Sequence, residues 1–257
     1  MSQKPKGLAA SLGAGTPVKI MYQYLLPYFD LPILHAINGF CGQSWLLDRL
    51  ISHVALDFKF AIPLCVFWVL WFKDGEDQLA RRRVLLIVIV AVLLSLVVNR
   101  AISVAMPYRV RPMETPNIGY HHPLFEEGFN LADFELWSSF PSDQATYFFA
   151  FATGFCFFSV RLGLAMFAYS AVIIMSRVYL GTHFPSDVLV GALLGVAVQL
   201  VLNRDYARAA MTPVLALQKS KPALFIALLF FVLLEMGTGF MNVRDIGRSV
   251  LHLAHGG

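Results

Sequence analysis

The stretch SRVYLGTHFPSDVLVGALLG, residues 176–195, decides the fold because it joins two apolar runs through a short polar connection. The run before the connection covers residues 162–181 and the run after it covers 185–202. Each is close to the roughly 20 mostly apolar residues that a transmembrane helix needs. The connection places His183 and Asp187 at a membrane edge, and ionisable side chains at membrane depth are functional candidates by default. The stretch therefore predicts two helices with a candidate site between them.

The rest of the chain has the composition of a membrane protein. Of its 257 residues, 58% are hydrophobic and only 14% are charged, whereas soluble domains carry about 25% charged residues. Six apolar segments are long enough, or nearly long enough, to cross a bilayer: 57–73, 83–106, 142–160, 162–181, 185–202 and 222–240. The sequence therefore predicts an all-α integral membrane bundle of about six spans.

The N-terminal region differs from these spans. The first 21 residues contain no apolar core of signal-peptide length, so the membrane helices themselves are expected to direct insertion. The following segment, 30–58, mixes apolar residues with Asp30, His35 and Asp48. This pattern is typical of a helix that lies in the membrane interface, and a helix packed on the side of the bundle explains it equally well. The predicted parts are a tail (1–29), a membrane core (30–202), and a connection, last span and tail (203–257).

Basic residues in the loops predict the orientation. Loops 73–83 and 203–221 each hold four basic residues, and short loops rich in Lys and Arg face the cytoplasm. Loops 107–141 and 181–185 then face outward. Loop 107–141 is the longest connection and the most acidic one, and long loops without secondary structure are usually functional. The polar cluster is therefore expected at the outer face.

Three arginines gather at the same edge, in NRAISVAMPYRVRP (99–112). Arg100 falls near the outer end of its helix, where extension of its side chain to lipid headgroups is the alternative interpretation. Arg109 and Arg111 follow in a segment that two flanking prolines hold extended, and at spacing i, i+2 they project to one side. Guanidinium groups match phosphate geometry. The segment therefore predicts an anion site.

A second signal lies in FPSDQ, residues 140–144. Pro141 and Ser142 stand at a helix start, where free N–H groups and the helix dipole favour a bound anion. An ordinary N-cap, in which Ser142 or Asp143 satisfies the first turn, explains the same residues. By itself this signal is weak.

The third signal is the opening stretch. If its second helix has begun by His183, Asp187 lies four residues on and shares its face. A carboxylate in that position can fix the tautomer of an imidazole and stabilise its cation. An isolated histidine near a helix start is usually structural, but this one shares its edge with Arg177 and Asp187. We therefore predict that His183 is catalytic.

These clusters resemble the signature of the type 2 phosphatidic acid phosphatase family, which includes bacterial polyprenyl-diphosphate phosphatases and vanadium haloperoxidases. The signature reads K-x6-R-P, then P-S-G-H, then S-R-x5-H-x3-D. The third motif matches at every fixed position: Ser176, Arg177, His183 and Asp187. The resemblance covers about residues 30–202, and residues 34–55 are similar to the N-terminal segment of the undecaprenyl-diphosphate phosphatase branch.

The resemblance implies a phosphatase in which His183 attacks phosphorus and becomes a phospho-histidine, with Asp187 as its orienting partner. It implies that Arg111, Arg177 and Ser142 hold the phosphate oxygens, and that neither a metal nor another cofactor is needed. The implied substrate is a lipid diphosphate or lipid phosphate. The implied location is the bacterial plasma (inner) membrane, with the site facing the periplasm or the exterior. The lipid and the oligomeric state stay open.

Two positions depart from the signature. Val104 stands where the first motif has its lysine, and Arg109 or Arg100 is expected to supply that charge. Gln144 stands where the second motif has its histidine, which protonates the leaving group in that family. A glutamine can donate and accept hydrogen bonds but cannot deliver a proton. A positioned general acid contributes about 10²–10⁴-fold to the rate, so this exchange bears on the reaction.

Three interpretations of Gln144 are compatible with the sequence. The substrate is a diphosphate, whose leaving phosphate has a second pKa of about 6 and needs little protonation. Alternatively, His121 or His122 from the outer loop supplies the proton, although a solvated pair of loop histidines is the simpler view of them. In the third interpretation hydrolysis is attenuated or lost, and the fold binds a lipid or transfers phosphate to another acceptor.

Other classes of function fit less well. The net charge of +4 is ordinary for a membrane protein with basic cytoplasmic loops and does not indicate a nucleic-acid partner. The three cysteines are scattered and form neither a disulfide framework nor a metal motif. A small-molecule transporter would carry charges near mid-membrane, whereas here they gather at one edge.

Overall fold

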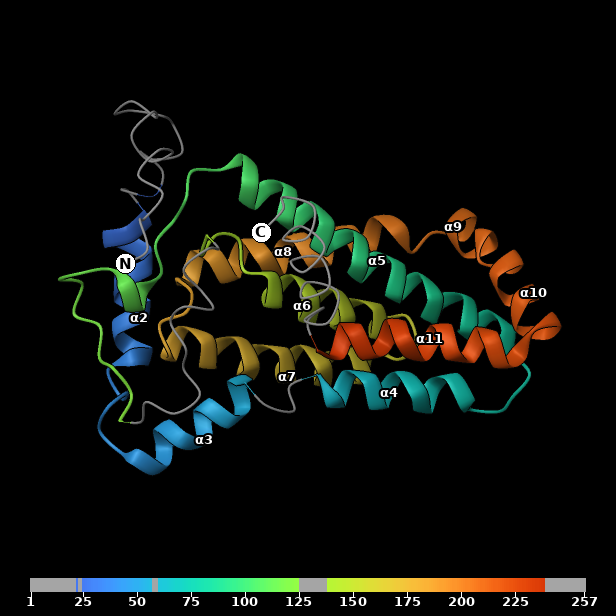
Figure 1. Cartoon of the computed structure of the whole chain (residues 1–257), viewed down its shortest axis with the longest axis horizontal. Helices are drawn as coiled ribbons and strands as arrows, with labels where there is room; N and C mark the ends of the chain where they lie inside the picture. The colour runs from blue at the N-terminus through green and yellow to red at the C-terminus, as the bar shows by residue number, and fades with distance from the viewer. Residues whose placement is uncertain (1–21, 23–24, 57–59, 125–137, 239–257) are drawn as a thin grey trace, which may run out of the picture. The chain divides into compact units, whose positions relative to one another are not determined.

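The structure, a computed structural model, describes residues 22, 25–56, 60–124 and 138–238, and these contain helices and no strand (Figure 1). The predicted N-terminal tail up to residue 21, the acidic residues 125–137 of the outer loop and the tail from residue 239 lie outside the described residues. The α-helices are α2 (Leu31–Asn38), α3 (Trp45–Leu56), α4 (Ala61–Phe72), α5 (Gln78–Ala105), α6 (Asp143–Cys156), α7 (Val160–Tyr179), α8 (Pro185–Leu202), α9 (Asp205–Ala210), α10 (Thr212–Ser220) and α11 (Pro222–Gly237). A π-helical turn, Leu26–Asp30, precedes α2, and a short 3₁₀ turn, Pro112–Glu114, follows α5.

The described helices confirm the all-α prediction. Each of the six predicted segments contains one helix, and α5, α7 and α8 are long and apolar enough to cross a membrane. The helices α4 and α11 are apolar but shorter, with 12 and 16 residues, and α6 has 14. The number of six spans therefore stays a prediction.

The chain divides into two compact units. One comprises the described residues of Met1–Asp57 and Val90–Val201, and the other those of Phe58–Ile89 and Leu202–Gly257. The C-terminal part of the second unit begins at Leu202, and this unit also contains α4 and the first part of α5. Its helices are joined by aromatic packing, since the rings of Trp71 and Phe225 stack with centroids 5.7 Å apart.

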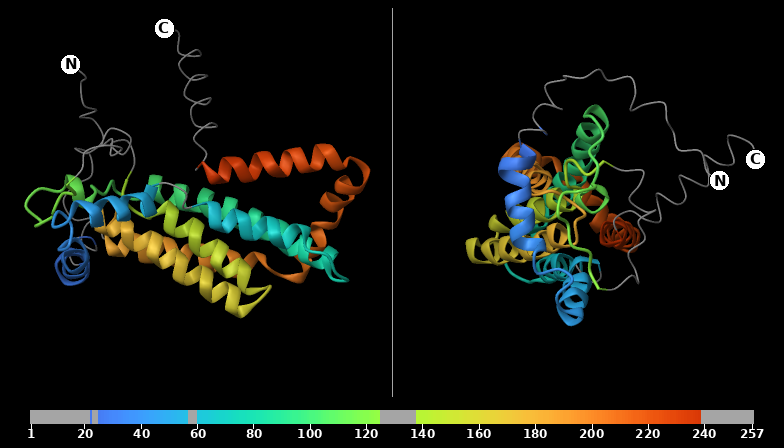
Figure 2. Two further views of the ribbon diagram at one scale, coloured as in Figure 1. Left: turned by 90° about the horizontal axis from the view of Figure 1, so that it is seen from below. Right: turned by 90° about the vertical axis from the view of Figure 1, so that its left-hand side faces the viewer.

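The first unit is built around α6, α7 and α8 (Figures 1 and 2). Helices α6 and α7 pack along each other, and aromatic side chains of α6 such as Phe148 and Phe151 are fully buried. Helix α8 approaches α6 closely at Gly191 and Gly195. A Cβ on Gly191 would lie 2.3 Å from the carbonyl oxygen of Ser142, so only glycine fits there. The GxxxG pattern therefore packs two helices within this fold and brings their first turns together.

Helices α2 and α3 pack against α7, and α2 runs across the ends of the long helices (Figures 1 and 2). The Asn38 side-chain amide donates to the Tyr179 carbonyl at 2.8 Å, and the buried carboxylate of Asp48 accepts from the Tyr179 hydroxyl at 2.6 Å. The opposite face of α3 is apolar and exposed, as at Trp45 and Leu50. This segment therefore combines packing on the bundle with the apolar exposed face expected of an interfacial helix; its position in a membrane stays a prediction.

Candidate active site

The third motif forms a tight turn between α7 and α8. Gly181 has a φ of +65°, a left-handed conformation that glycine adopts without strain. His183 follows in this turn and is only 4% exposed. Its Nδ1 lies 2.9 Å from the carbonyl oxygen of Ser139. Because a carbonyl only accepts hydrogen bonds, Nδ1 carries the proton and Nε2 carries the lone pair.

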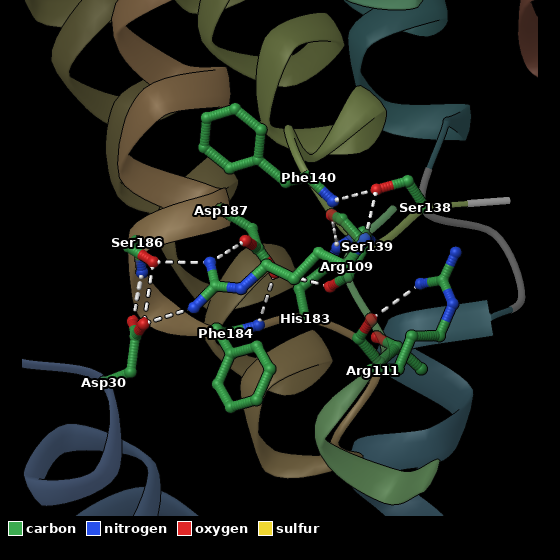
Figure 3. A network of polar contacts seen from close by, with 11 residues as sticks. Asp30, Arg109, Arg111, Ser138, Ser139, Phe140, His183, Phe184, Ser186 and Asp187 are labelled. Atoms are coloured by element: carbon green, nitrogen blue, oxygen red, sulfur yellow. Dashed lines mark hydrogen bonds and ion pairs between the residues drawn. The ribbon is translucent and has the colours of Figure 1, made fainter. Parts of the chain in front are cut away.

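Asp187 reaches His183 indirectly, through Ser139 (Figure 3). Its carboxylate accepts hydrogen bonds from the Ser139 hydroxyl and, at 2.8 Å, from the Phe184 backbone N–H. The sequence predicts a direct contact on one helix face, which requires a helix that has begun by residue 183. Helix α8 begins at Pro185 instead. His183 therefore precedes the helix, and a backbone carbonyl takes the place that was expected for the carboxylate.

The structure brings together three of the four arginines that the sequence assigns to phosphate binding. Arg109, Arg111 and Arg177 are buried, at 6%, 5% and 3% exposure, whereas Arg100 is exposed on α5. Arg111 donates to the carbonyl oxygen of Thr182, directly before His183, at 2.6 Å. Arg177 lies in the last turn of α7. Both guanidinium groups are therefore neighbours of the His183 turn.

Arg109 has different partners from those that the sequence predicts. One guanidinium nitrogen forms an ion pair with Asp187 and donates to the Ser186 hydroxyl at 2.8 Å. The other forms an ion pair with Asp30 at 2.5 Å. The aromatic ring of Phe184 lies 4.4 Å below its central carbon. Arg109 is thus already held by two carboxylates (Figure 3).

Asp30 is a charged residue of the site that sequence reasoning did not assign. It ends the turn before α2, is fully buried, and accepts from the backbone N–H and the hydroxyl of Ser186 at 2.8 and 2.9 Å. A carboxylate in an apolar N-terminal segment was a usable signal, because a buried charge needs a partner. The partner lies 79 residues away, and no local pattern identifies it.

The electrostatics of the turn favour a neutral imidazole. Burial lowers the pKa of His183 well below its ordinary value of 6.5, and the positive charges of Arg111 and Arg177 lower it further. Burial also lowers the pKa of Arg111, while the negative charge of Asp143 opposes that change. His183 is therefore uncharged at neutral pH and keeps its lone pair on Nε2.

The first turn of α6 forms the other side of the site. Ser142 is buried and is the N-cap, since its Oγ accepts from the Ala145 backbone N–H at 3.3 Å. The capping interpretation therefore holds, and the hydroxyl proton is left to donate to a ligand. Asp143 is exposed. Gln144 is half-buried, and among the described residues its Oε1 has no hydrogen-bond partner although that atom is buried.

The loop histidines lie elsewhere. The backbone of His121 is fixed to α2, where its N–H donates to the Asn38 side chain at 2.7 Å. The ring of His122 packs on Tyr120 with centroids 4.7 Å apart. Both residues are exposed, and neither joins the buried cluster around His183.

The fold and this cluster together define a helical membrane protein with a buried histidine next to arginines. Residues 83–211 match the PAP2 superfamily, and the chain belongs to this family. The family resemblance that the motifs predict is thereby confirmed. A similar curated protein, "Putative undecaprenyl-diphosphatase YbjG" of Escherichia coli K12, is 32% identical over 67% of this chain and 80% of its own length.

Further relatives belong to other bacteria. The "Bacitracin transport permease protein BcrC" of Bacillus licheniformis is 26% identical over 62% of this chain and 72% of its own. Among solved structures, LpxE of Aquifex aeolicus has a TM-score of 0.46 and 26% identity, covering 67% of this chain and 93% of its own. A PAP2-type phosphatidylglycerolphosphate phosphatase of Bacillus subtilis has a TM-score of 0.45 and 20% identity, covering 72% and 89%.

Proposed function

We propose that this protein removes the terminal phosphate of a polyprenyl diphosphate, with undecaprenyl diphosphate as the leading candidate, through a phosphorylated His183. The observation that carries the proposal is the hydrogen bond from Nδ1 of His183 to the Ser139 carbonyl. It leaves Nε2 as a nucleophile in a buried turn, next to the positive charges of Arg111 and Arg177.

The reaction proceeds in two displacements. Nε2 of His183 attacks the terminal phosphorus, and the N–P bond forms as the bond from that phosphorus to the bridging oxygen breaks. The electron pair leaves with the polyprenyl phosphate. Water then attacks the phospho-histidine, the N–P bond breaks, its electron pair returns to Nε2, and inorganic phosphate leaves. Splitting one difficult displacement into two is the usual gain of nucleophilic catalysis.

Arg111 and Arg177 are assigned to the phosphate oxygens, because guanidinium groups suit the charge that spreads over the transferred phosphoryl group. Ser142 adds a hydroxyl donor at the N-terminus of α6, where the helix dipole also favours an anion. Its backbone N–H donates to the Asp187 carbonyl at 3.1 Å, which fixes this helix end beside the His183 turn.

Gln144 supports a diphosphate as substrate. An alkoxide that leaves from a phosphate monoester needs a proton, and glutamine cannot provide one. A phosphate that leaves from a diphosphate needs less help, because its second pKa is about 6. The role of Gln144 is then to donate a hydrogen bond to a phosphate oxygen.

A cavity beside Arg109 supports a lipid as the leaving group. Its volume is about 190 Å³, and its lining is mostly apolar, with Tyr22, Leu26, Val110 and Phe184 around the guanidinium. A cavity with this lining suits the first isoprene units next to a phosphate. The name of the Escherichia coli relative supports undecaprenyl diphosphate among the polyprenyl lipids.

The orientation of the loops supports a site at the outer face of a bacterial plasma membrane. Helix α5 begins at Gln78, contains Arg81 and Arg82 near its start, and ends shortly before Arg109. Its 28 residues extend about 42 Å at 1.5 Å per residue, enough to cross a bilayer core of about 30 Å. Basic loops face the cytoplasm, so the site faces the periplasm or the exterior.

A second function is favoured by Gln144 alone. Without a general acid, the protein would be attenuated or inactive as a hydrolase, and would bind a phospholipid or pass phosphate from His183 to an acceptor hydroxyl. A phosphotransferase would consume the lipid diphosphate without releasing phosphate, whereas a binding protein would leave it intact.

Phosphate release by the purified protein in detergent tests the proposal. Wild type, His183→Ala and Gln144→His are compared on undecaprenyl diphosphate and phosphatidic acid, with His122→Ala as a matched control at an exposed histidine. We expect wild type and His122→Ala to cleave the diphosphate faster than the monoester, and His183→Ala to release nothing above background.

The alternative outcomes are distinct. A lipid labelled in its terminal phosphate should label wild-type protein with an acid-labile phosphate, and His183→Ala should stay unlabelled. Faster cleavage of phosphatidic acid than of the diphosphate would exclude the proposed substrate. Silence of the wild type, with activity only in Gln144→His, would show that hydrolysis has been switched off.

A further inference from the structure

The N-terminal segment contributes a charged residue to the buried cluster. Asp30 is fully buried, and its two carboxylate oxygens are occupied by Arg109, at 2.5 Å, and by the hydroxyl and N–H of Ser186. Three contacts from two distant parts of the chain meet on this one side chain. The first turn of α8 therefore rests on the N-terminal segment (Figure 3).

Arg109 connects Asp30 to the nucleophile. It forms ion pairs with Asp30 and with Asp187. Asp187 accepts from the hydroxyl of Ser139, and the carbonyl of that same residue accepts from His183 Nδ1. A continuous series of hydrogen bonds and ion pairs thus runs from the N-terminal segment to the imidazole.

The charges separate the three buried arginines into two groups. Arg109 lies between two carboxylates, and together with Asp30 and Asp187 it carries a net charge of −1. Arg111 and Arg177 instead face the His183 turn, and their positive charges act on the imidazole there. A phosphate dianion is attracted to Arg111 and Arg177, and it is repelled by the negatively charged cluster of Arg109 with its two carboxylates. Arg109 is therefore suited to hold the protein in place rather than to bind substrate.

We propose that Asp30 is a positioning residue that fixes Arg109, and through Arg109, Asp187 and Ser139 sets the orientation of His183. This inference rests on the proposed function only for its kinetic test. It predicts that the N-terminal segment is part of the active enzyme, and that Arg109 acts on the nucleophile rather than as a phosphate ligand.

The primary test is the kinetics of Asp30→Asn, which keeps the shape of the side chain but removes its charge. Because a displacement of about 1 Å can cost 10²-fold in rate, we expect kcat to fall about 10- to 100-fold while KM stays within about threefold. Arg111→Lys should instead raise KM, because it alters a predicted phosphate ligand.

Asp48→Asn is the matched control. Asp48 is the other fully buried carboxylate of the described N-terminal segment, and its partners are neutral: the Tyr179 hydroxyl and the N–H groups of Gly42 and Leu124. It does not touch the His183 cluster through any of these contacts. Its replacement should lower thermal stability but leave kcat of the folded protein within about threefold, as expected for a residue away from the reaction.

A double-mutant cycle separates action through Arg109 from an independent effect. If Asp30 acts through Arg109, the double variant Asp30→Asn/Arg109→Gln should be no slower than Arg109→Gln alone. Asp30→Glu should recover part of the lost kcat, because it restores the charge. Additive losses in the cycle, or a kcat in folded Asp30→Asn equal to that of wild type, would overturn the inference.

A spectroscopic arm keeps this test separate from the phosphatase proposal. In protein labelled with ¹⁵N-histidine, the Asp30→Asn exchange should move the His183 signals, whereas Asp48→Asn should leave them in place. An inactive wild type with this shift would refute the phosphatase and retain the positioning role. Unchanged His183 signals in folded Asp30→Asn would refute the positioning role whatever the activity.

Discussion

The first turns of α8 and α6 form two sides of the same site, and their polar groups are satisfied to different degrees. On the α8 side, Asp187 accepts three hydrogen bonds or ion pairs, and Nδ1 of His183 has a fixed partner. On the α6 side, Ser142 caps its helix, Asp143 is exposed, and the buried Oε1 of Gln144 lacks a hydrogen-bond partner among the described residues.

In the proposed reaction, the α8 side holds the group that attacks phosphorus and the α6 side faces the leaving group. The Ser139 carbonyl holds the proposed nucleophile, His183, in one tautomer and one orientation, which would cost no reorganisation during the proposed reaction. The side expected to face the leaving group has a glutamine, Gln144, whose buried Oε1 has no hydrogen-bond partner among the described residues. Under the proposed mechanism, the fold organises the attack on phosphorus, and the departure of the leaving group depends on that group's own chemistry.

The largest expected loss of stability comes from removing the carboxylate of Asp187, the hydrogen-bond acceptor at the centre of the α8 side. Asp187→Ala removes the acceptor of the buried Ser139 hydroxyl and of the Phe184 N–H, and each buried donor left unsatisfied costs about 1–3 kcal/mol. On the α6 side, Gln144→Ala should change the free energy of unfolding by no more than about 0.5 kcal/mol. Thermal unfolding in detergent measures the stability of both variants. Equal destabilisation by Asp187→Ala and Gln144→Ala would contradict the difference in hydrogen bonding between the α8 and α6 sides.

The next largest effect is expected from adding a proton donor on the α6 side of the site. Gln144→His should raise turnover of phosphatidic acid by about 10²-fold, the lower end of what a general acid contributes, and turnover of polyprenyl diphosphate by less than about tenfold. Gln144→Asn is the control, because it keeps the amide and shortens the side chain. Equal gains on both lipids would mean that leaving-group protonation does not explain the role of Gln144.

A smaller effect, on thermal stability, is expected where α8 packs against α6. A Cβ on Gly195 would lie 2.2 Å from the Thr146 carbonyl oxygen, a backbone atom that cannot rotate away. Overpacking of this kind costs typically about 1–3 kcal/mol, so Gly195→Ala should lower the unfolding temperature. Leu193→Ala, at a position on α8 that is 60% exposed, is the matched control and should unfold near the wild-type temperature.

The smallest effect concerns the pH dependence of His183. Its pKa lies well below 6.5 because of burial and the charges of Arg111 and Arg177. The nucleophilic, neutral form predominates above the pKa, so kcat/KM should not fall as pH drops through 6.5, and should decline only at lower pH. Titration of ¹⁵N-histidine signals separates this from ionisation of the substrate. A proton on Nε2, or a midpoint at or above 6.5, would contradict the proposed nucleophile.

Much of the fold followed from local patterns. Apolar runs located α5, α7 and α8 because a span is a contiguous property of the chain. The spacing of Gly191 and Gly195 is also a local pattern, and it permits the close packing of α8 on α6 that the structure shows. Local patterns do not predict the division into two units, because α4 packs with the C-terminal helices through pairs such as Trp71 and Phe225, which are far apart in sequence.

The sequence motifs predicted only part of the candidate site. The burial of Arg111, Arg177 and His183 in one region agrees with the motif-based assignment, while their catalytic roles stay predictions. The contacts of Arg109 and Asp187 differ from expectation because both depend on where α8 begins and on which distant groups reach it. A helix that starts two residues later than assumed replaces one hydrogen-bond partner of His183 with another.

By itself, the sequence determined that this is a helical membrane protein of the PAP2 superfamily with a histidine and an arginine in its third motif, because hydropathy and motif spacing are local. Only the tertiary structure decided that Asp30 meets Arg109, and that Asp187 reaches His183 through Ser139. Buried charges take whichever partner the packed helices bring within reach, and that partner is fixed by the fold, not by distance along the chain.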